Sequence, residues 1–311
     1  MAAELTVRQA EAALAAVGLK GAQVRAVEAL TGGVSNLTYR VELSDGPAVV
    51  VRIQPEHGIF EPYDVVREAR VLTALRSTAV PVPAVLGSEA DGETLGAPFF
   101  VMEYVDAPHM GTIPRSAAVT DSYVRAVAAI HDVDWRAAGL DFLSPAVPGT
   151  EPAARDLATV NARARRYGHD ADPFIAELGE WLGRHHPSTE DLVLCQGDIN
   201  VFNYLFRGED VVAVVDWEQA QIADRQSDLG LLSALSYLLG AQGPPQRLPI
   251  MTEYGERTGA ALSSLGYYVL AGLHKLAVIH RIWSELGDSP PWYSWDQITT
   301  SARMMRDQID G

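Results

Sequence analysis

The hydrophobic period of this chain changes once, near residue 105, and that change limits the folds open to it. Before it, residues 37–43 carry an apolar side chain at every second position, and a Ser-Asp-Gly-Pro turn leads into the apolar run AVVVRI. After it, the pattern is mostly helical except between residues 192 and 217. We therefore predict an α+β chain with a β-rich N-lobe (residues 1–105) and a mainly helical C-lobe (residues 106–311).

Two helices are predicted within the N-lobe. The first begins with Thr6 and Gln9 in a capping-box pattern, and its apolar face would hold Val7, Ala10, Leu14 and Val17. Pro62 is expected to open the second, with Glu68 beside its inward face. That inward face would hold Val65, Ala69, Leu72 and Leu75. The segments VPVPAVLG and APFFVMEYV are expected to form a loop and a strand.

Composition and charge exclude several classes of protein. The formal net charge of −16 is a poor match to a nucleic-acid or anionic-membrane binder, because both partners are negatively charged. A single cysteine, Cys195, excludes an intramolecular disulfide and a multi-cysteine zinc site, and its apolar flanks predict burial. No run approaches the roughly 18 apolar residues of a membrane span, and charged residues interrupt the N-terminal segment. A cytoplasmic location is expected, and the oligomeric state stays open.

Polar residues gather beside the one predicted hairpin of the C-lobe. The apolar runs NYLF and VVAVV are joined by Arg-Gly-Glu-Asp, and pairing Phe206 with Val211 would set Asn203 opposite Val214. Asp216 would then emerge about two residues beyond Asn203, at the end where the preceding loop places Asp198. Two carboxylates held together need a cation or a proton between them.

These residue types suit phosphoryl transfer. Mg²⁺ prefers oxygen ligands and is usually bound by one or two carboxylates together with phosphate oxygens. Asp198 could accept a proton from a hydroxyl nucleophile, and Asp216 and Asn203 could hold the metal.

The same residues resemble a known family. QGDINVFN, then VVDWE, then ADRQSDLG is similar to the aminoglycoside phosphotransferase and choline kinase-like family, which shares the protein-kinase fold. The resemblance implies a two-lobe protein-kinase-like fold, Asp198 as catalytic base, and Asn203 and Asp216 as Mg²⁺ ligands. It also implies that Asp224 and Asp228 order the loop formed by ADRQSDLG. The stretches DWEQAQIAD and HKLAVIHR look most like the branch related to acyl-CoA dehydrogenase-associated kinases.

Matching positions occur in the N-lobe, in the order that the family requires. The stretch TGGVSN resembles the family's nucleotide loop, in which backbone N–H groups approach phosphates. Arg52 occupies the kinase lysine position, and Glu68 that of its ion-pair partner. The nucleotide-binding residues implied by the resemblance are Gly32, Gly33, Ser35, Asn36, Arg52, Glu68 and the hinge Met102, Glu103 and Tyr104.

Three departures from the family pattern bear on activity. Gln196 replaces the histidine that usually braces the loop, Arg52 replaces lysine, and Asn200 stands where several relatives carry a residue reaching toward the leaving phosphate. Arginine can still grip phosphates, with forked rather than point-charge geometry.

The resemblance implies a small-molecule kinase that moves the γ-phosphate of ATP or GTP to a hydroxyl group, with Mg²⁺ as cofactor. A nucleotide-binding pseudokinase or regulatory module is the alternative, although such a protein would commonly have lost one of Asp198, Asn203 and Asp216. Asp228 follows Asp216 by only twelve positions, which leaves little room for an activation segment and disfavours a protein kinase.

The acceptor is expected to bind against residues after 230. A mild charge balance there and the aromatic Trp292, Tyr293 and Trp295 favour a largely neutral hydroxyacyl metabolite or a macrolide-like natural product over an aminoglycoside. An antibiotic-resistance phosphotransferase therefore stays among the alternatives.

Overall fold

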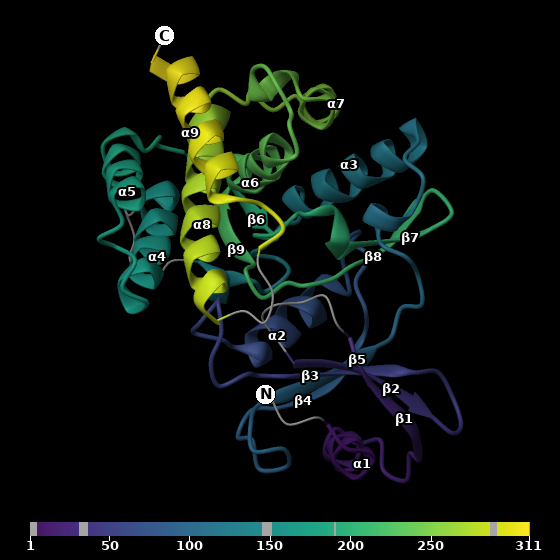
Figure 1. Cartoon of the computed structure of the whole chain (residues 1–311). Coiled ribbons are helices and arrows are strands. Elements are labelled where there is room, and N and C mark those ends of the chain that lie inside the picture. The colour runs from purple at the N-terminus through teal and green to yellow at the C-terminus, as the bar shows by residue number, and fades with distance from the viewer. Residues whose placement is uncertain (1–4, 31–36, 145–150, 190, 287–290, 311) are drawn as a thin grey trace.

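The computed structural model describes residues 5–30, 37–144, 151–189, 191–286 and 291–310. It has two lobes, a five-stranded sheet with two helices and a larger helical body (Figure 1). The fold class predicted from the sequence, a two-lobe protein-kinase-like α+β chain, is confirmed by the comparisons given below. None of the helices in these segments has the length and apolar character that a membrane-spanning helix needs.

The N-lobe sheet is antiparallel, in the order β1-β2-β3-β5-β4. Its strands are β1 (Val24–Ala29), β2 (Leu37–Leu43), β3 (Val49–Ile53), β4 (Val85–Glu89) and β5 (Phe99–Glu103). All five residues of β3 are buried, as the apolar run predicts. The prediction of a loop in VPVPAVLG was wrong in its second half, because Val85 and the residues after it pair with β5 as an edge strand.

Helix α1 (Val7–Ala16) has the predicted capping box of Thr6 and Gln9. Ala10 and Leu14 are buried as expected, but Val7 is 42% exposed. Leu5, the residue before the cap, is buried with Ala10 in one cluster, as in a hydrophobic staple, so it covers the place expected for Val7.

Helix α2 (Val65–Leu75) buries all four predicted apolar residues and Glu68. It does not begin at Pro62. The helix begins after Asp64, whose side chain accepts a hydrogen bond from the N–H of Arg67 at 2.8 Å. Capping by a carboxylate satisfies a first-turn donor, which proline cannot do.

The C-lobe contains α3 (Ala117–His131), α4 (Pro152–Arg166), α5 (Pro173–His185), α6 (Arg225–Leu238), α7 (Pro249–Thr258), α8 (Leu265–Leu286) and α9 (Trp295–Asp310). Helices α4, α5, α8 and α9 lie together on one side, and α3 and α7 on the other (Figure 1). This lobe also holds two short antiparallel ladders, β6 (Leu192–Cys195) with β9 (Gln221–Asp224), and β7 (Tyr204–Arg207) with β8 (Asp210–Val214).

The hairpin of β7 and β8 corrects the predicted register. Phe206 pairs with Val211 as expected, but a shift after Leu205 sets Tyr204 opposite Val214. The N–H of Val215 then donates to Asn203 O at 2.9 Å. Such an irregularity cannot be read from residue counting, and it brings Asn203 one residue closer to Asp216 than expected.

Candidate active site

Asp198 lies three residues after β6 and is held by amides of its own loop. Asn200 Nδ2 donates to Asp198 Oδ2 at 2.9 Å, and Asn203 Nδ2 reaches the same oxygen at 3.2 Å and the main-chain O of Asp198 at 2.9 Å. Within the described segments no donor reaches Asp198 Oδ1. One carboxylate oxygen is thus oriented by the loop while the other can accept a proton.

Gln196 and Gly197 fix the start of this loop. The N–H groups of both donate to the carboxylate of Asp228, at 2.9 and 2.8 Å. Gly197 has φ +85°, and a Cβ there would collide with the main chain of Gln219, so the position requires glycine. The side chain of Gln196 donates to the main-chain O atoms of Val215 and Asp216, at 3.0 and 2.8 Å. Glutamine therefore braces the loop in place of the family's histidine.

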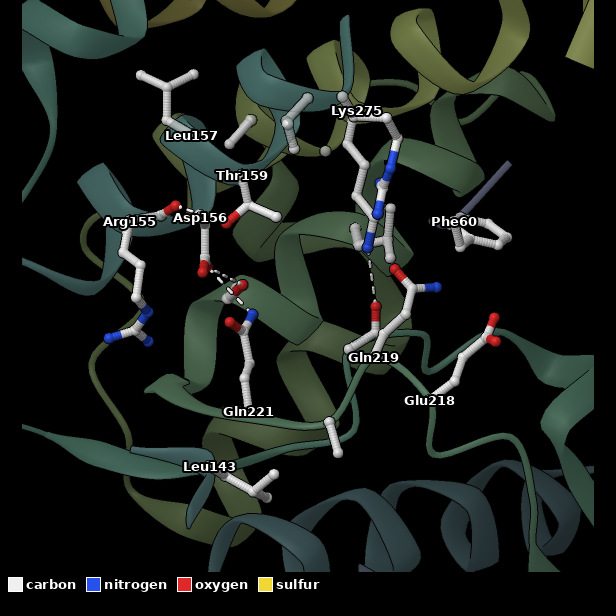
Figure 2. Close-up of a pocket in the computed structure, with 18 of the residues that line it drawn as sticks. Phe60, Leu143, Arg155, Asp156, Leu157, Thr159, Glu218, Gln219, Gln221 and Lys275 are labelled. Atoms are coloured by element: carbon white, nitrogen blue, oxygen red, sulfur yellow. Dashed lines mark hydrogen bonds between the residues drawn. The ribbon is translucent and has the colours of Figure 1, made fainter. Parts of the chain in front are cut away.

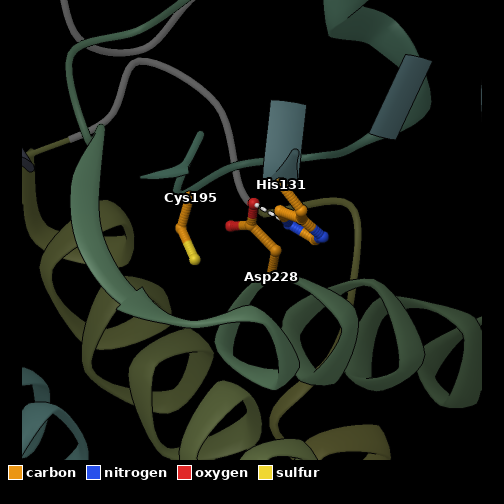
Figure 3. A group of neighbouring side chains, drawn as sticks. All are labelled: His131, Cys195 and Asp228. Carbon is orange, nitrogen blue, oxygen red and sulfur yellow. Dashed lines mark hydrogen bonds and ion pairs between the residues drawn. The ribbon is translucent and has the colours of Figure 1, made fainter. Parts of the chain in front are cut away.

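Asp228 also belongs to a buried group with His131 and Cys195, whose potential ligand atoms lie within 4.8 Å of one another (Figure 3). His131 Nε2 lies 3.2 Å from Asp228 Oδ2, and His131 Nδ1 lies 2.7 Å from the hydroxyl of Tyr254. The thiol of Cys195 donates to Asp224 O at 3.4 Å. Because protein partners occupy these atoms, the group is an anchor for the loop rather than a metal site. The expected ordering role of Asp228 and the burial of Cys195 are both confirmed.

Arg52, Glu68 and Asp216 meet between the lobes. Arg52 Nε lies 3.0 Å from Glu68 Oε2, and Arg52 Nη2 lies 2.6 Å from Asp216 Oδ1 and 3.7 Å from Glu218 Oε2. The N–H of Trp217 donates to Glu68 Oε1 at 3.1 Å. Arg52 and Glu68 are both buried, so their ion pair lies inside the protein and not on its surface. Asp216 has φ 64°, a left-handed conformation that costs energy in a residue other than glycine.

Burial and neighbouring charges shift the acidities of these groups. Burial and the nearby carboxylate of Asp216 raise the pKa of Asp198, while Lys275 opposes the rise. Burial raises the pKa of Glu68 against the pull of Arg52. Burial alone would lower the pKa of Arg52, but its three carboxylate neighbours raise it above the ordinary value. Arg52 therefore keeps its positive charge.

The oxygen atoms of Asn203 and Asp216, close to Asp198, suit a hard divalent cation. Asn203 donates through Nδ2, which leaves its carbonyl oxygen available, and Asp216 bonds Arg52 through only one carboxylate oxygen. The repulsion between Asp198 and Asp216 is the electrostatic situation that a bound cation relieves. Oxygen ligands of this kind are those that Mg²⁺ prefers.

A cavity of about 390 Å³ opens beside Gly197. Its walls are the segment from Phe60 to Glu68, helix α4, helix α8 and the segment from Glu218 to Gln221. Figure 2 shows Lys275 reaching from α8 toward the loop at Gln219, while Asp156 of α4 meets Gln221 on the other side. The ammonium of Lys275 donates to the main-chain O of Gly197 at 3.1 Å, one residue before Asp198.

The remaining residues expected at the site fall in different places. Gly32, Gly33, Ser35 and Asn36 lie outside the described residues. Met102, Glu103 and Tyr104 form the end of β5 and the residue after it, and the N–H groups of the last two donate to Ala84 O (2.8 Å) and Ala48 O (3.4 Å). Two main-chain donors of the expected hinge are therefore engaged in the sheet.

The aromatic residues before α9 do not line the cavity. Trp292 is half exposed, but Tyr293 is buried and its hydroxyl donates to Leu276 O at 3.3 Å. Trp295 is the first residue of α9, and its ring stacks on the guanidinium of Arg281 at 3.6 Å. Tyr293 lies in the segment before α9, but its ring packs against α8 and does not face an acceptor site.

Sequence reasoning missed the cavity's own polar residues, Asp156, Arg163 and Lys275. One signal was available. Lys275 is the only charged residue between Leu265 and His280 of an otherwise apolar helix, and lysine is rarely buried without a partner. Asp156 and Arg163 follow no motif, and only the packing of α4 against α8 brings them here.

A kinase-like fold with a carboxylate loop beside a second aspartate defines a phosphoryl-transfer protein. Residues 26–266 match the model of the Phosphotransferase enzyme family, and the chain belongs to that family. The prediction of a phosphotransferase is therefore confirmed.

The chain is also similar to acyl-CoA dehydrogenase family member 10 of Mus musculus, with 30% identity over 235 residues, which is 72% of this chain and 21% of the relative. The chain spans a third or less of the length of the curated relatives that it matches.

Solved structures show the same fold. A candidate aminoglycoside phosphotransferase from Ralstonia eutropha JMP134 superposes with a TM-score of 0.70 at 24% identity, covering 96% of each chain. A thermostable mutant of aminoglycoside phosphotransferase APH(4)-Ia, in a ternary complex with AMP-PNP and hygromycin B, superposes with a TM-score of 0.65 at 14% identity. That match covers 97% of this chain and 98% of the other.

Proposed function

We propose that this phosphotransferase moves the γ-phosphoryl group of a nucleoside triphosphate, ATP or GTP, to a hydroxyl group of a small molecule. The observation that carries the proposal is the carboxylate of Asp198, which accepts hydrogen bonds through one oxygen, has no donor at the other among the described residues, and follows Gly197 of the cavity wall in the chain. The nucleotide and substrate complex of the structurally similar enzyme supports the presence of a donor site in this fold.

In this proposal each polar group has its own task. Asp198 accepts the proton of the acceptor hydroxyl as that oxygen bonds to the γ-phosphorus. The bond from the γ-phosphorus to the β–γ bridging oxygen breaks, and the nucleoside diphosphate leaves. Asn203 and Asp216 would hold Mg²⁺, which neutralises charge on the phosphate oxygens. Arg52, fixed by Glu68, lies where it can bind donor phosphates.

The N-lobe (residues 1–105) is proposed to bind the nucleotide, with the glycine-containing segment and the hinge at Met102–Tyr104 as contacts. The C-lobe (residues 106–311) is proposed to bind the acceptor. A cavity of about 390 Å³ lies near the lower end of ligand pockets, which favours a short hydroxyacyl-type metabolite over a macrolide or an aminoglycoside.

The test separates the roles of the two aspartates. Asp198→Asn should lower kcat by about 10²–10⁴-fold and leave Mg-nucleotide affinity nearly unchanged, because only the proton acceptor is lost. Asp216→Asn should weaken Mg-nucleotide binding itself, as calorimetric titration would measure. Asp210→Asn, on the exposed turn of the β7–β8 hairpin, is the matched control.

Equal Mg-nucleotide affinity in the two site variants would refute this division of labour. Nucleotide binding without consumption, across a broad panel of alcohols, would instead favour the pseudokinase alternative.

A further inference from the structure

Two cations face the cavity without a carboxylate partner. Lys275 uses one of its three donors on Gly197 O, and Arg163 makes no hydrogen bond within the described segments. Its guanidinium lies 5.4 Å from the ring of Phe60. Neither cation lies within 4 Å of a carboxylate in the parts of the chain that the structure describes. Burial lowers the pKa of Lys275, the more distant carboxylates of Asp198 and Asp156 oppose that shift, and Arg163 adds to it.

The cavity also has carboxylates, but other donors engage them. Asp156 accepts from Gln221 and Ser227, each at 3.2 Å. Glu68 and Glu218 face Arg52, and Asp64 caps α2. The acids of the cavity wall therefore leave the charges of Lys275 and Arg163 uncompensated by any close ion pair.

Two further arginines of the wall donate only to main-chain oxygens within the described segments. Arg155 donates to Ile222 O at 2.6 Å, and its second terminal nitrogen is buried without a partner. Arg67 donates to the carbonyls of Glu218 and Ala220. The apolar part of the lining consists of Leu143, Ala153, Leu157, Val160, Leu231 and Ala271, and uncharged polar side chains such as Thr159, Gln219 and His274 line it as well. The cavity thus combines hydrocarbon surface with cations that have donors to spare.

Lys275 and Arg163 are each half-buried. Withdrawing a cation from water without an ion-pair partner is costly, and an anion placed between the two removes that cost. We infer that the acceptor is a short hydroxy carboxylic acid whose carboxylate is bound by Lys275 and Arg163 while its hydroxyl lies against Asp198. This inference rests on the proposed kinase function and names its substrate class. Since Lys275 bonds the residue before Asp198, one end of the substrate is fixed close to the catalytic loop. Lys275 and Arg163 would then determine specificity, and a polycationic acceptor would be repelled.

The experiment compares matched acceptors. The probes are 3-hydroxybutyrate and 6-hydroxyhexanoate, the methyl ester of each, and the corresponding diols, with turnover followed by nucleotide consumption. Binding of the same probes to protein saturated with Mg-ADP is measured by calorimetry. The wild type should prefer at least one acid over its ester and diol by about tenfold or more, as charge-assisted hydrogen bonds give.

The variants Arg163→Gln and Lys275→Met should each lose most of that preference through KM, with Mg-nucleotide affinity unchanged. Arg165→Gln is the control for the first, because it removes the same charge from the exposed face of α4. Lys20→Met is the control for the second, since Lys20 is the only other lysine of the chain.

The outcomes separate this inference from the proposed function. Acids that bind to wild type but not to the variants, without any turnover, would support the anion site but overturn the assignment of such acids as acceptors, and the broad panel of alcohols would then decide the kinase assignment. Turnover of esters and diols as efficient as that of the acids would overturn the inference and leave the kinase intact. Variants that weaken Mg-nucleotide binding instead would also overturn it, because the two cations would then serve the donor phosphates. Failure of both acids to bind or react overturns it as well.

Discussion

Two cationic groups flank the segment from Asp216 to Gln221, and their surroundings differ. Arg52 has three carboxylates within 3.7 Å, whereas Lys275 and Arg163 have none within 4 Å among the described residues. The positive charge of the first group is matched by carboxylates of the chain, which join β3, α2 and the end of the hairpin around the arginine proposed to bind the donor phosphates. The second leaves donors facing a cavity. A closed charge network stabilises the fold, and an open one is suited to a ligand.

The largest effect is expected from a variant that removes one carboxylate from the network around Arg52. Glu68→Gln removes the buried partner of Arg52 and should lower the free energy of unfolding by about 3 kcal/mol, because it leaves a buried cation less well compensated. Glu28→Gln, which removes the exposed partner of Arg40, should cost at most about 1 kcal/mol. Denaturant titration measures both. A similar loss in the two variants would mean that burial does not distinguish the Arg52 network.

The next effect concerns the loop that carries Asp198, which lies between the Arg52 network and Lys275. Asp228→Asn weakens the two hydrogen bonds from the main chain of Gln196 and Gly197, so Asp198 should be misplaced and kcat should fall by about 10²-fold. Mg-nucleotide affinity should change little. Asp132→Asn, at the exposed end of α3, is the control. An unchanged kcat in Asp228→Asn would show that the loop holds its shape without this anchor.

A smaller effect tests the role of Lys275, one of the two cations that lack a close carboxylate. Lys275 opposes the raised pKa of Asp198, so Lys275→Met should raise that pKa further. Because the base must be deprotonated, the acid limb of the kcat/KM–pH profile should move toward higher pH. Lys20→Met should leave the profile in place. A shift toward lower pH would contradict the electrostatic coupling between Lys275 and Asp198.

The smallest effect concerns Asp156. Burial raises the pKa of its carboxyl group to about 6. Its ionisation is harder in the folded chain than in the unfolded one, so its contribution to stability falls as the pH rises from about 4 through 6. Asp156→Asn should therefore raise Tm by about 2 °C at pH 8 relative to wild type, with little change at pH 4. Asp170→Asn, an exposed position, serves as control. Equal changes at both pH values would show that ionisation of Asp156 carries no cost.

The closed group was largely predictable from the sequence. Periodicity placed Arg52 in an apolar strand, Glu68 on the helix that follows and Asp216 at the end of an apolar run, and the family resemblance predicted that Arg52 and Glu68 form an ion pair. The predicted register still failed by one residue, because the irregularity after Leu205 depends on how β7 packs rather than on residue type.

The open group was not predictable in the same way. Lys275 and Arg163 lie 112 positions apart on helices whose mutual packing no local pattern encodes. Expecting residues after 230 to form the acceptor pocket identified α8 but missed α4 and the segment before α2, which supply much of the wall.

The close approach of α6 and α8 has a mechanical consequence. A methyl group added at Gly230 of α6 would lie 2.5 Å from the main chain of Tyr268, so the two helices touch backbone to backbone. Helix α6 carries Asp228, which grips the catalytic loop, and α8 carries Lys275. Sliding one helix along the other would require the backbones to separate first. Asp198 and Lys275 are therefore expected to move together as parts of one rigid unit. An opening between the lobes would change the distance of each to Arg52 and preserve the distance between the two.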